Sequence, residues 1–216
     1  MNTDNETNPG SFRYPGFSLI ELLVSIAIIA VLIGILLPAL GGAMGSARSV
    51  RCQANLRSLV TGLQMYRDDN KGDIPWAVTF PHTIDNPEPF LALTSYLDVS
   101  MPQGVVGEDV TRLDPFVCPS DKAYSSLTGF SYSYRPASFM QVSPEEWSRA
   151  DMRRILKLYT EPQSFGAGLV YPRGFAVLSD RYRFHVDEKR RADMRAPDQT
   201  GMNLAYLDGS VRKGGK

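Results

Sequence analysis

The feature that most constrains this chain is an apolar run, Leu22–Leu40, which contains no charged side chain and directly follows Glu21. The run holds about 19 residues, close to the ~20 that an α-helix needs to cross a hydrocarbon core of ~30 Å. A carboxylate placed in hydrocarbon costs a few kcal/mol even on the gentler insertion scales. Glu21 is therefore a candidate functional residue that needs a partner able to compensate its charge.

The helical pattern continues past this run. Apolar residues recur at three- and four-residue steps with arginines between them, which is typical of an amphipathic helix. The expected apolar stripe consists of Ala47, Val50, Ala54, Leu56, Leu59, Leu63 and Tyr66. We expect one helix over residues 17–70, transmembrane over about 20–40 and amphipathic over 43–70, with a bend at Pro38.

Residues 71–216 are expected to form a globular head with an antiparallel sheet, which makes the fold class α+β. A short helix is predicted near Pro89–Leu97, and a second from a cap at Ser143 to about Tyr159. Alternating or compact apolar residues predict strands at 129–134 and 174–179. Near the end of the chain, residues 203–207 and 210–212 flank Asp208-Gly209, which predicts a hairpin with a two-residue turn.

The composition narrows the range of functions. The chain has 216 residues, with 23 basic and 23 acidic side chains, so no basic footprint for a nucleic-acid partner is expected. His82 and His185 are the only imidazoles, and neither has metal-ligand spacing. We therefore expect no enzymatic activity and no metal site. Cys52 and Cys118 could form one disulfide in an oxidising compartment, or stay as two separate buried thiols.

The residues around the start of the apolar run carry a resemblance. Gly16 is followed by Phe17, and Glu21 comes four residues after that Phe. This arrangement resembles the type IV pilin-like proteins, most closely the pseudopilins of bacterial type II secretion. Pro38 also falls where many pilins carry a helix-bending proline. The resemblance implies cleavage between Gly16 and Phe17 by a prepilin peptidase, N-methylation of Phe17, and assembly with other pilin or pseudopilin subunits through Glu21.

The same resemblance implies an organisation and a location. Residues 1–16 would be a cytoplasmic leader, and the helix would cross the bacterial inner membrane once, with the head exported. Taken alone, the charges argue for the opposite orientation, because Arg13 is the leader's one cation whereas Arg48, Arg51 and Arg57 follow the apolar run.

The head resembles a pseudopilin subgroup that ends in Asp-Gly, here Asp208-Gly209, although Asp198 stands where that subgroup has His. Some pseudopilins bind calcium in a C-terminal loop, which makes Asp180, Asp198 and Asp208 its candidate ligands. The alternative function is a monomeric periplasmic binding or enzymatic head that uses a prepilin-type anchor only as a tether.

Overall fold

The computed structural model describes residues 18–77, 88–136, 140, 148–165, 169–171, 174–180 and 201–214. The chain divides into two compact units, Met1–Ala43 and Met44–Lys216, and helix α1 contributes to both. The predicted leader, residues 1–16, and Phe17 lie outside the described residues.

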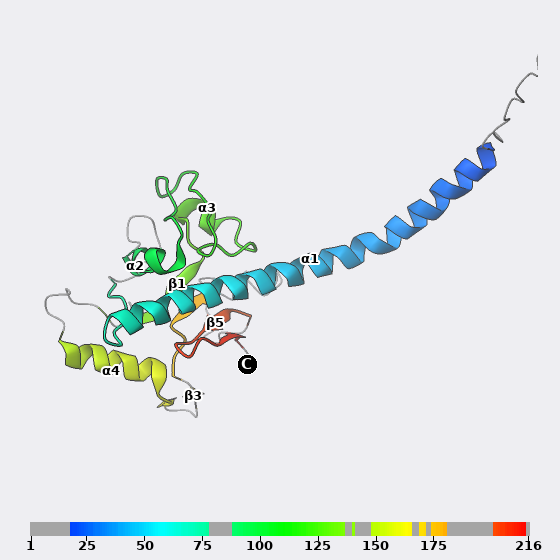
Figure 1. Ribbon diagram of the computed structural model, residues 1–216. Helices are drawn as coiled ribbons and strands as arrows, with labels where there is room; N and C mark the ends of the chain where they lie inside the picture. Colours follow the sequence, from blue (N-terminus) through cyan, green and yellow to red (C-terminus); the bar gives the residue numbers. More distant parts are fainter. Residues whose placement is uncertain are drawn as a thin grey trace, which may run out of the picture. The chain divides into compact units, whose positions relative to one another are not determined.

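Helix α1 runs without interruption from Leu19 to Asp69, within the predicted 17–70 (Figure 1). Its fully buried positions all lie in the second unit and are Cys52, Asn55, Leu56, Leu59, Val60, Gly62 and Leu63. Of the predicted apolar stripe, Ala47, Val50 and Ala54 are exposed. Two residues turn an α-helix by about 200°, so positions 50 and 54 point away from the face that buries Cys52.

The second unit contains the sheet. Strands β1 (Tyr132–Tyr134), β4 (Leu178–Asp180), β5 (Asn203–Ala205) and β6 (Val211–Lys213) form one antiparallel sheet in the order β1-β4-β5-β6. The predicted α+β class is therefore confirmed. A separate antiparallel hairpin, β2 (Gln163–Phe165) with β3 (Leu169–Tyr171), was not predicted. Of the stretch expected to be a strand at 174–179, only its end belongs to β4.

The hairpin between β5 and β6 is confirmed, but its turn is longer than predicted. The Tyr206 N–H donates to the Ser210 carbonyl at 3.0 Å, which leaves the three residues Leu207–Gly209 as the loop. The Gly209 N–H donates to the Tyr206 carbonyl at 3.0 Å, and Gly209 has φ 84°. This is the three-residue loop that combines a type I turn with a left-handed residue, and glycine adopts that conformation without strain.

The remaining helices also lie in the second unit. Helix α2 (Glu88–Leu97) confirms the helix predicted near Pro89–Leu97, whereas the short α3 (Tyr124–Thr128) was not predicted. Helix α4 (Arg149–Thr160) ends close to the predicted Tyr159 but does not begin at Ser143, which lies outside the described residues. Ser148 is extended and exchanges hydrogen bonds with Asp151, and this reciprocal capping box starts the helix at Arg149.

The core consists of buried side chains from α1, α2, α4, the sheet and the loops between them. Phe90, Phe116 and Phe130 form a buried aromatic cluster, with ring centroids 5.0–6.0 Å apart. Gly62 on α1 lets α2 approach closely, because a Cβ there would lie 2.9 Å from Leu97 Cγ. From β1, the Tyr134 hydroxyl donates to the Pro75 carbonyl at 2.8 Å, so the sheet is bonded to the segment that follows α1.

A disulfide joins α1 to the loop that precedes α3. Cys52 and Cys118 are both fully buried and are bonded to each other. One turn further along α1, the Asn55 amide donates to the Val117 carbonyl at 2.7 Å and to Asp114 Oδ1 at 2.9 Å. The loop is therefore held to α1 by the disulfide, by two hydrogen bonds from Asn55 and by the ion pair of Arg51 with Asp114.

Breaking the disulfide is expected to destabilise the head. The bond closes a loop with a sequence separation of 66 residues. On the chain-entropy account, a loop of that size stabilises the folded state by about 4 kcal/mol. Addition of a reductant to the full chain in detergent should lower the urea midpoint of unfolding correspondingly.

A variant with Cys52→Ala and Cys118→Ala is the matched control. It should unfold at the low midpoint whether or not reductant is present. An oxidised wild-type chain whose unfolding midpoint does not change on reduction would contradict the assigned role of this bond.

Candidate functional site

The first described residue caps helix α1. Ser18 precedes the helix, and its Oγ accepts a hydrogen bond from the Ile20 N–H at 3.3 Å. In return, the Ser18 N–H donates to Glu21 Oε2 at 2.9 Å. Ser18 thus caps the helix through the amide two residues on, and Glu21 returns the bond to the Ser18 N–H that a capping box has, which satisfies amides that the helix itself leaves unpaired.

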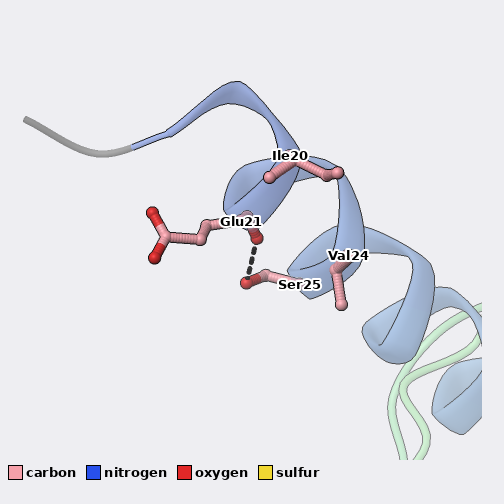
Figure 2. Close-up of a pocket in the computed structure, with 4 residues that line it drawn as sticks. All are labelled: Ile20, Glu21, Val24 and Ser25. Atoms are coloured by element: carbon pink, nitrogen blue, oxygen red, sulfur yellow. Dashed lines mark hydrogen bonds between the residues drawn. The ribbon is translucent and has the colours of Figure 1, made fainter.

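The Glu21 side chain points outward from the first turn of α1 (Figure 2). It lies beside Ile20, Val24 and Ser25, which line an open hollow on the helix surface. The Ser25 Oγ donates to the Glu21 carbonyl at 2.7 Å, so the serine one turn later satisfies its hydroxyl within the helix. The carboxylate is thus the one charged group in a stretch of surface that is otherwise apolar.

The apolar run that follows Glu21 is uncovered. Ile35 is 69% exposed and Leu36 is 63% exposed, and no part of the most apolar window of α1 is buried. Among the described residues, α1 is the one helix that is long and apolar enough to cross a membrane. By length and composition alone, a signal sequence near the N-terminus has the same features. In water such a surface is unfavourable, so it requires lipid or another apolar surface.

Pro38 lies inside α1, and the helix continues through it. Proline has no N–H, so the carbonyl four residues earlier, that of Gly34, receives no hydrogen bond from position 38. Apart from its chain neighbours and the nearby backbone of α1, nothing lies within 4 Å of the place that a Cβ on Gly34 would occupy. The bend at Pro38 stays a prediction.

The residues predicted for a site fall into two sets. Glu21 and Pro38 lie on α1 within the first unit, and Gly16 and Phe17, just before α1, lie outside the described residues. Cys52 and Cys118 lie in the second unit, where they form the disulfide. Sequence reasoning missed Ser18, although the spacing Ser18-Leu19-Ile20-Glu21 is a readable signature of a capping box.

The carboxylates named for calcium have other roles where they are described. Asp208 Oδ1 accepts a hydrogen bond from the Ser210 N–H at 2.8 Å, which shapes the β5–β6 loop. Asp180 Oδ2 accepts one from the Asn203 N–H at 2.7 Å, and Asp198 lies outside the described residues. Within the described ranges, no group of three or more His, Cys, Asp or Glu side chains is placed to hold a metal ion.

One family matches this region of the chain. The prokaryotic N-terminal methylation motif matches residues 12–37, which include Gly16, Phe17 and Glu21 and most of the apolar run. No curated protein and no solved structure matches the chain. The motif marks pilin-type precursors that a prepilin peptidase processes, and the long apolar helix followed by a small α+β head is the pilin-like arrangement.

The most perturbed acid that the structure describes in the head is Asp180, which is fully buried. Burial raises its pKa from 3.8 to about 7, and the charge of Asp121 adds to the rise, whereas hydrogen bonds from Asn203 oppose it. Asp121 is itself buried and accepts hydrogen bonds from the Tyr124 N–H and the Ser131 hydroxyl. The two acids bind polar groups of the chain that holds them, which is a structural use of buried carboxylates.

The raised pKa of Asp180 predicts that the head loses stability as the pH rises. Below about pH 4 the carboxyl is protonated both folded and unfolded, so its full contribution is present. Between about pH 4 and pH 7 the unfolded chain releases this proton and the folded chain keeps it, which favours unfolding. Asp180→Asn should therefore gain stability over wild type, by a few kcal/mol, on going from pH 4.5 to about pH 7.5.

Urea midpoints of the full chain in detergent at both pH values measure this difference. Asp109→Asn, at an exposed acid, is the control and should follow the wild-type curve. Parallel pH dependence in wild type and Asp180→Asn would contradict the assignment.

Proposed function

We propose that this chain is a structural subunit of a pilin-like filament, of the kind formed by the pseudopilins of type II secretion or by type IV pilins. A prepilin peptidase cleaves it between Gly16 and Phe17 and methylates the new amino terminus. One observation carries the proposal: the methylation motif coincides with an uncovered apolar helix whose first turn holds a single acid.

The cost of the Glu21 charge supports assembly. Cleavage gives Phe17 a free ammonium four residues before Glu21. In a stack of subunits, the Phe17 ammonium of one chain can pair with the Glu21 carboxylate of the next. Such a pair compensates both charges in apolar surroundings and fixes how far one helix is shifted along another.

The surface of α1 supports packing between subunits. Without water, helices associate through van der Waals contact, and small residues allow their backbones to approach. At Gly34, Gly41, Gly42 and Gly45, nothing but the chain neighbours and the nearby backbone of α1 lies within 4 Å of the position that a Cβ would occupy. The helix of a neighbouring subunit can therefore lie close to α1 along this stretch.

The disulfide supports export of the head. Disulfides persist in oxidising compartments and are rare where thiols are kept reduced. Cys52 and Cys118 both follow the apolar run and are bonded. In the proposed topology the leader is cytoplasmic, the helix crosses the inner membrane once, and the head lies outside. The opposite orientation, which Arg48, Arg51 and Arg57 favour by charge, would place this bond in a reducing compartment.

The end of the head supports the narrower assignment to the Asp-Gly subgroup of pseudopilins. Asp208 and Gly209 both shape the loop between β5 and β6, one by accepting the Ser210 N–H and the other by its left-handed backbone. No metal site is proposed here, and Asp180, Asp198 and Asp208 stay candidate calcium ligands by resemblance alone. The tethered monomeric head is the competing function, and the assembly experiment below decides between them.

Processing should fail when Gly16 is replaced by a bulky residue. Gly16 has no side chain to obstruct the cleft of a peptidase, whereas Gly16→Val places a branched one next to the cut. In cells that contain a prepilin peptidase, Gly16→Val should accumulate as a longer chain in the membrane, and Gly16→Ala should be cleaved at a rate between the two. Mobility on a denaturing gel reports the cleavage. A wild-type chain that keeps its leader in these cells would refute processing.

Assembly should depend on the charge of Glu21. Glu21→Ala and Glu21→Val should insert and be cleaved like wild type, because removal of the charge makes the helix more apolar. Both should fail to assemble, since a neutral side chain leaves the subunit stable in the bilayer and removes the pairing that sets the register. Glu21→Gln keeps the shape of the side chain and loses its charge. It should also fail to assemble, which would show that the charge and not the side-chain volume is required.

A photo-crosslinking amino acid at position 50 measures assembly, because Val50 is exposed on α1 and lies in the unit that forms the head. Loss of subunit-to-subunit products in the neutral variants is the expected result. Undiminished products in Glu21→Ala would show that the acid does not determine assembly. A wild-type chain that is cleaved but never gives such products would favour the tethered head.

A further inference from the structure

The carboxylate of Glu21 already has a partner in its own chain. Oε2 accepts the Ser18 N–H at 2.9 Å, and the Ser18 Oγ accepts the Ile20 N–H at 3.3 Å. Within the described residues, no donor is bonded to the other carboxylate oxygen, Oε1. One oxygen of the acid is therefore anchored to the helix cap, and the other is open toward the outside of the helix.

We propose that Ser18 is a positioning residue for Glu21, which holds the carboxylate at the helix end so that Oε1 faces a neighbouring subunit. This inference rests on the proposed function, because the group that Oε1 receives is the ammonium of a second, processed copy of this chain. The cap also compensates part of the charge by the backbone N–H of Ser18 while the subunit is still alone in the membrane.

The cap and the pairing between subunits do not compete. An ionised carboxylate has two oxygens with about four acceptor positions, so it can accept the Ser18 N–H and a neighbour's ammonium together. A negative charge in the first turn also suits the positive end of the helix dipole. An anchored carboxylate loses less side-chain entropy on pairing than a mobile one. The capped Glu21 therefore binds the neighbour's ammonium more tightly.

Apolar surroundings make the serine hydroxyl important. The first amides of a helix have no partner within the helix, and in hydrocarbon water cannot supply one. Ser18 gives the Ile20 amide an acceptor, and its carbonyl accepts the Glu21 N–H at 3.1 Å. Without the hydroxyl the first turn frays, and the geometry that aims Glu21 is lost with it.

Threonine and valine have nearly the same shape, so substituting each for Ser18 distinguishes the effect of the hydroxyl from the effect of side-chain volume. Ser18→Thr keeps an oxygen that can accept the Ile20 N–H, whereas Ser18→Val has a methyl group in its place. Both are tested in the full chain with the photo-crosslinking residue at position 50, and products are counted per cleaved subunit. Loss of a cap typically corresponds to about a five-fold change in equilibrium. Ser18→Val should therefore give about five-fold fewer products, and Ser18→Thr should give the wild-type yield.

The controls distinguish failure of this inference from failure of the proposed function. Wild-type yield in Ser18→Val, or an equal loss in Ser18→Val and Ser18→Thr, would overturn the role of Ser18, even while Glu21→Ala still abolishes the products. Undiminished products in Glu21→Ala would instead refute the assembly role itself. Ser18→Ala, which lacks both the hydroxyl and the β-branch, should match Ser18→Val, and a wild-type yield from it would likewise overturn the proposal.

Discussion

A single carboxylate at the start of an uncovered apolar helix is the constraint on which the rest of this structure depends. Glu21 must be compensated wherever the helix lies, because neither lipid nor a packed helix interface solvates a charge. The cap supplies part of that compensation through the Ser18 N–H. In the proposed function, the remainder comes from the processed amino terminus of a second copy of this chain, four residues before its own Glu21.

The same helix has a different task in its second half. From Cys52 onward, α1 is part of the head's core, fixed by the bond to Cys118 and by the Asn55 amide. Further along, Gln64 Nε2 donates to the Leu207 carbonyl at 3.0 Å, which ties α1 to the loop between β5 and β6. The head therefore forms around the second half of α1, and it cannot release this part of the helix without unfolding.

The parts of the structure that the sequence predicts well are those governed by local rules. The long helix, helix α2 and the β5–β6 hairpin follow from periodicity and from Asp208-Gly209. The turn length was missed because Asp-Gly suits both two- and three-residue loops, and hydrogen bonding of Tyr206 with Ser210 decides between them. The start of α4 was missed because the prediction placed the cap at Ser143, whereas Ser148 forms a capping box with Asp151 and starts the helix.

Other features depend on packing between distant segments, which a local sequence pattern cannot predict. Val50 and Ala54 fit a helical period as well as Cys52 does, and only the position of the sheet decides which face is buried. The burial that raises the pKa of Asp180 arises because distant segments surround it, with Asn203 beside it on β5. The cap at Ser18 differs from these features, because the sequence itself contains its spacing to Glu21. Its importance comes from the exposed apolar surface around it.

The central claim is that cleavage creates the charge that Glu21 requires. Mass spectrometry of the amino terminus of the wild-type protein, isolated from membranes of a cell with a prepilin peptidase, tests it most directly. The account predicts a chain that begins at Phe17 and carries one methyl group on its terminal nitrogen. A chain that begins at Met1, or at any residue beyond Glu21, would contradict it.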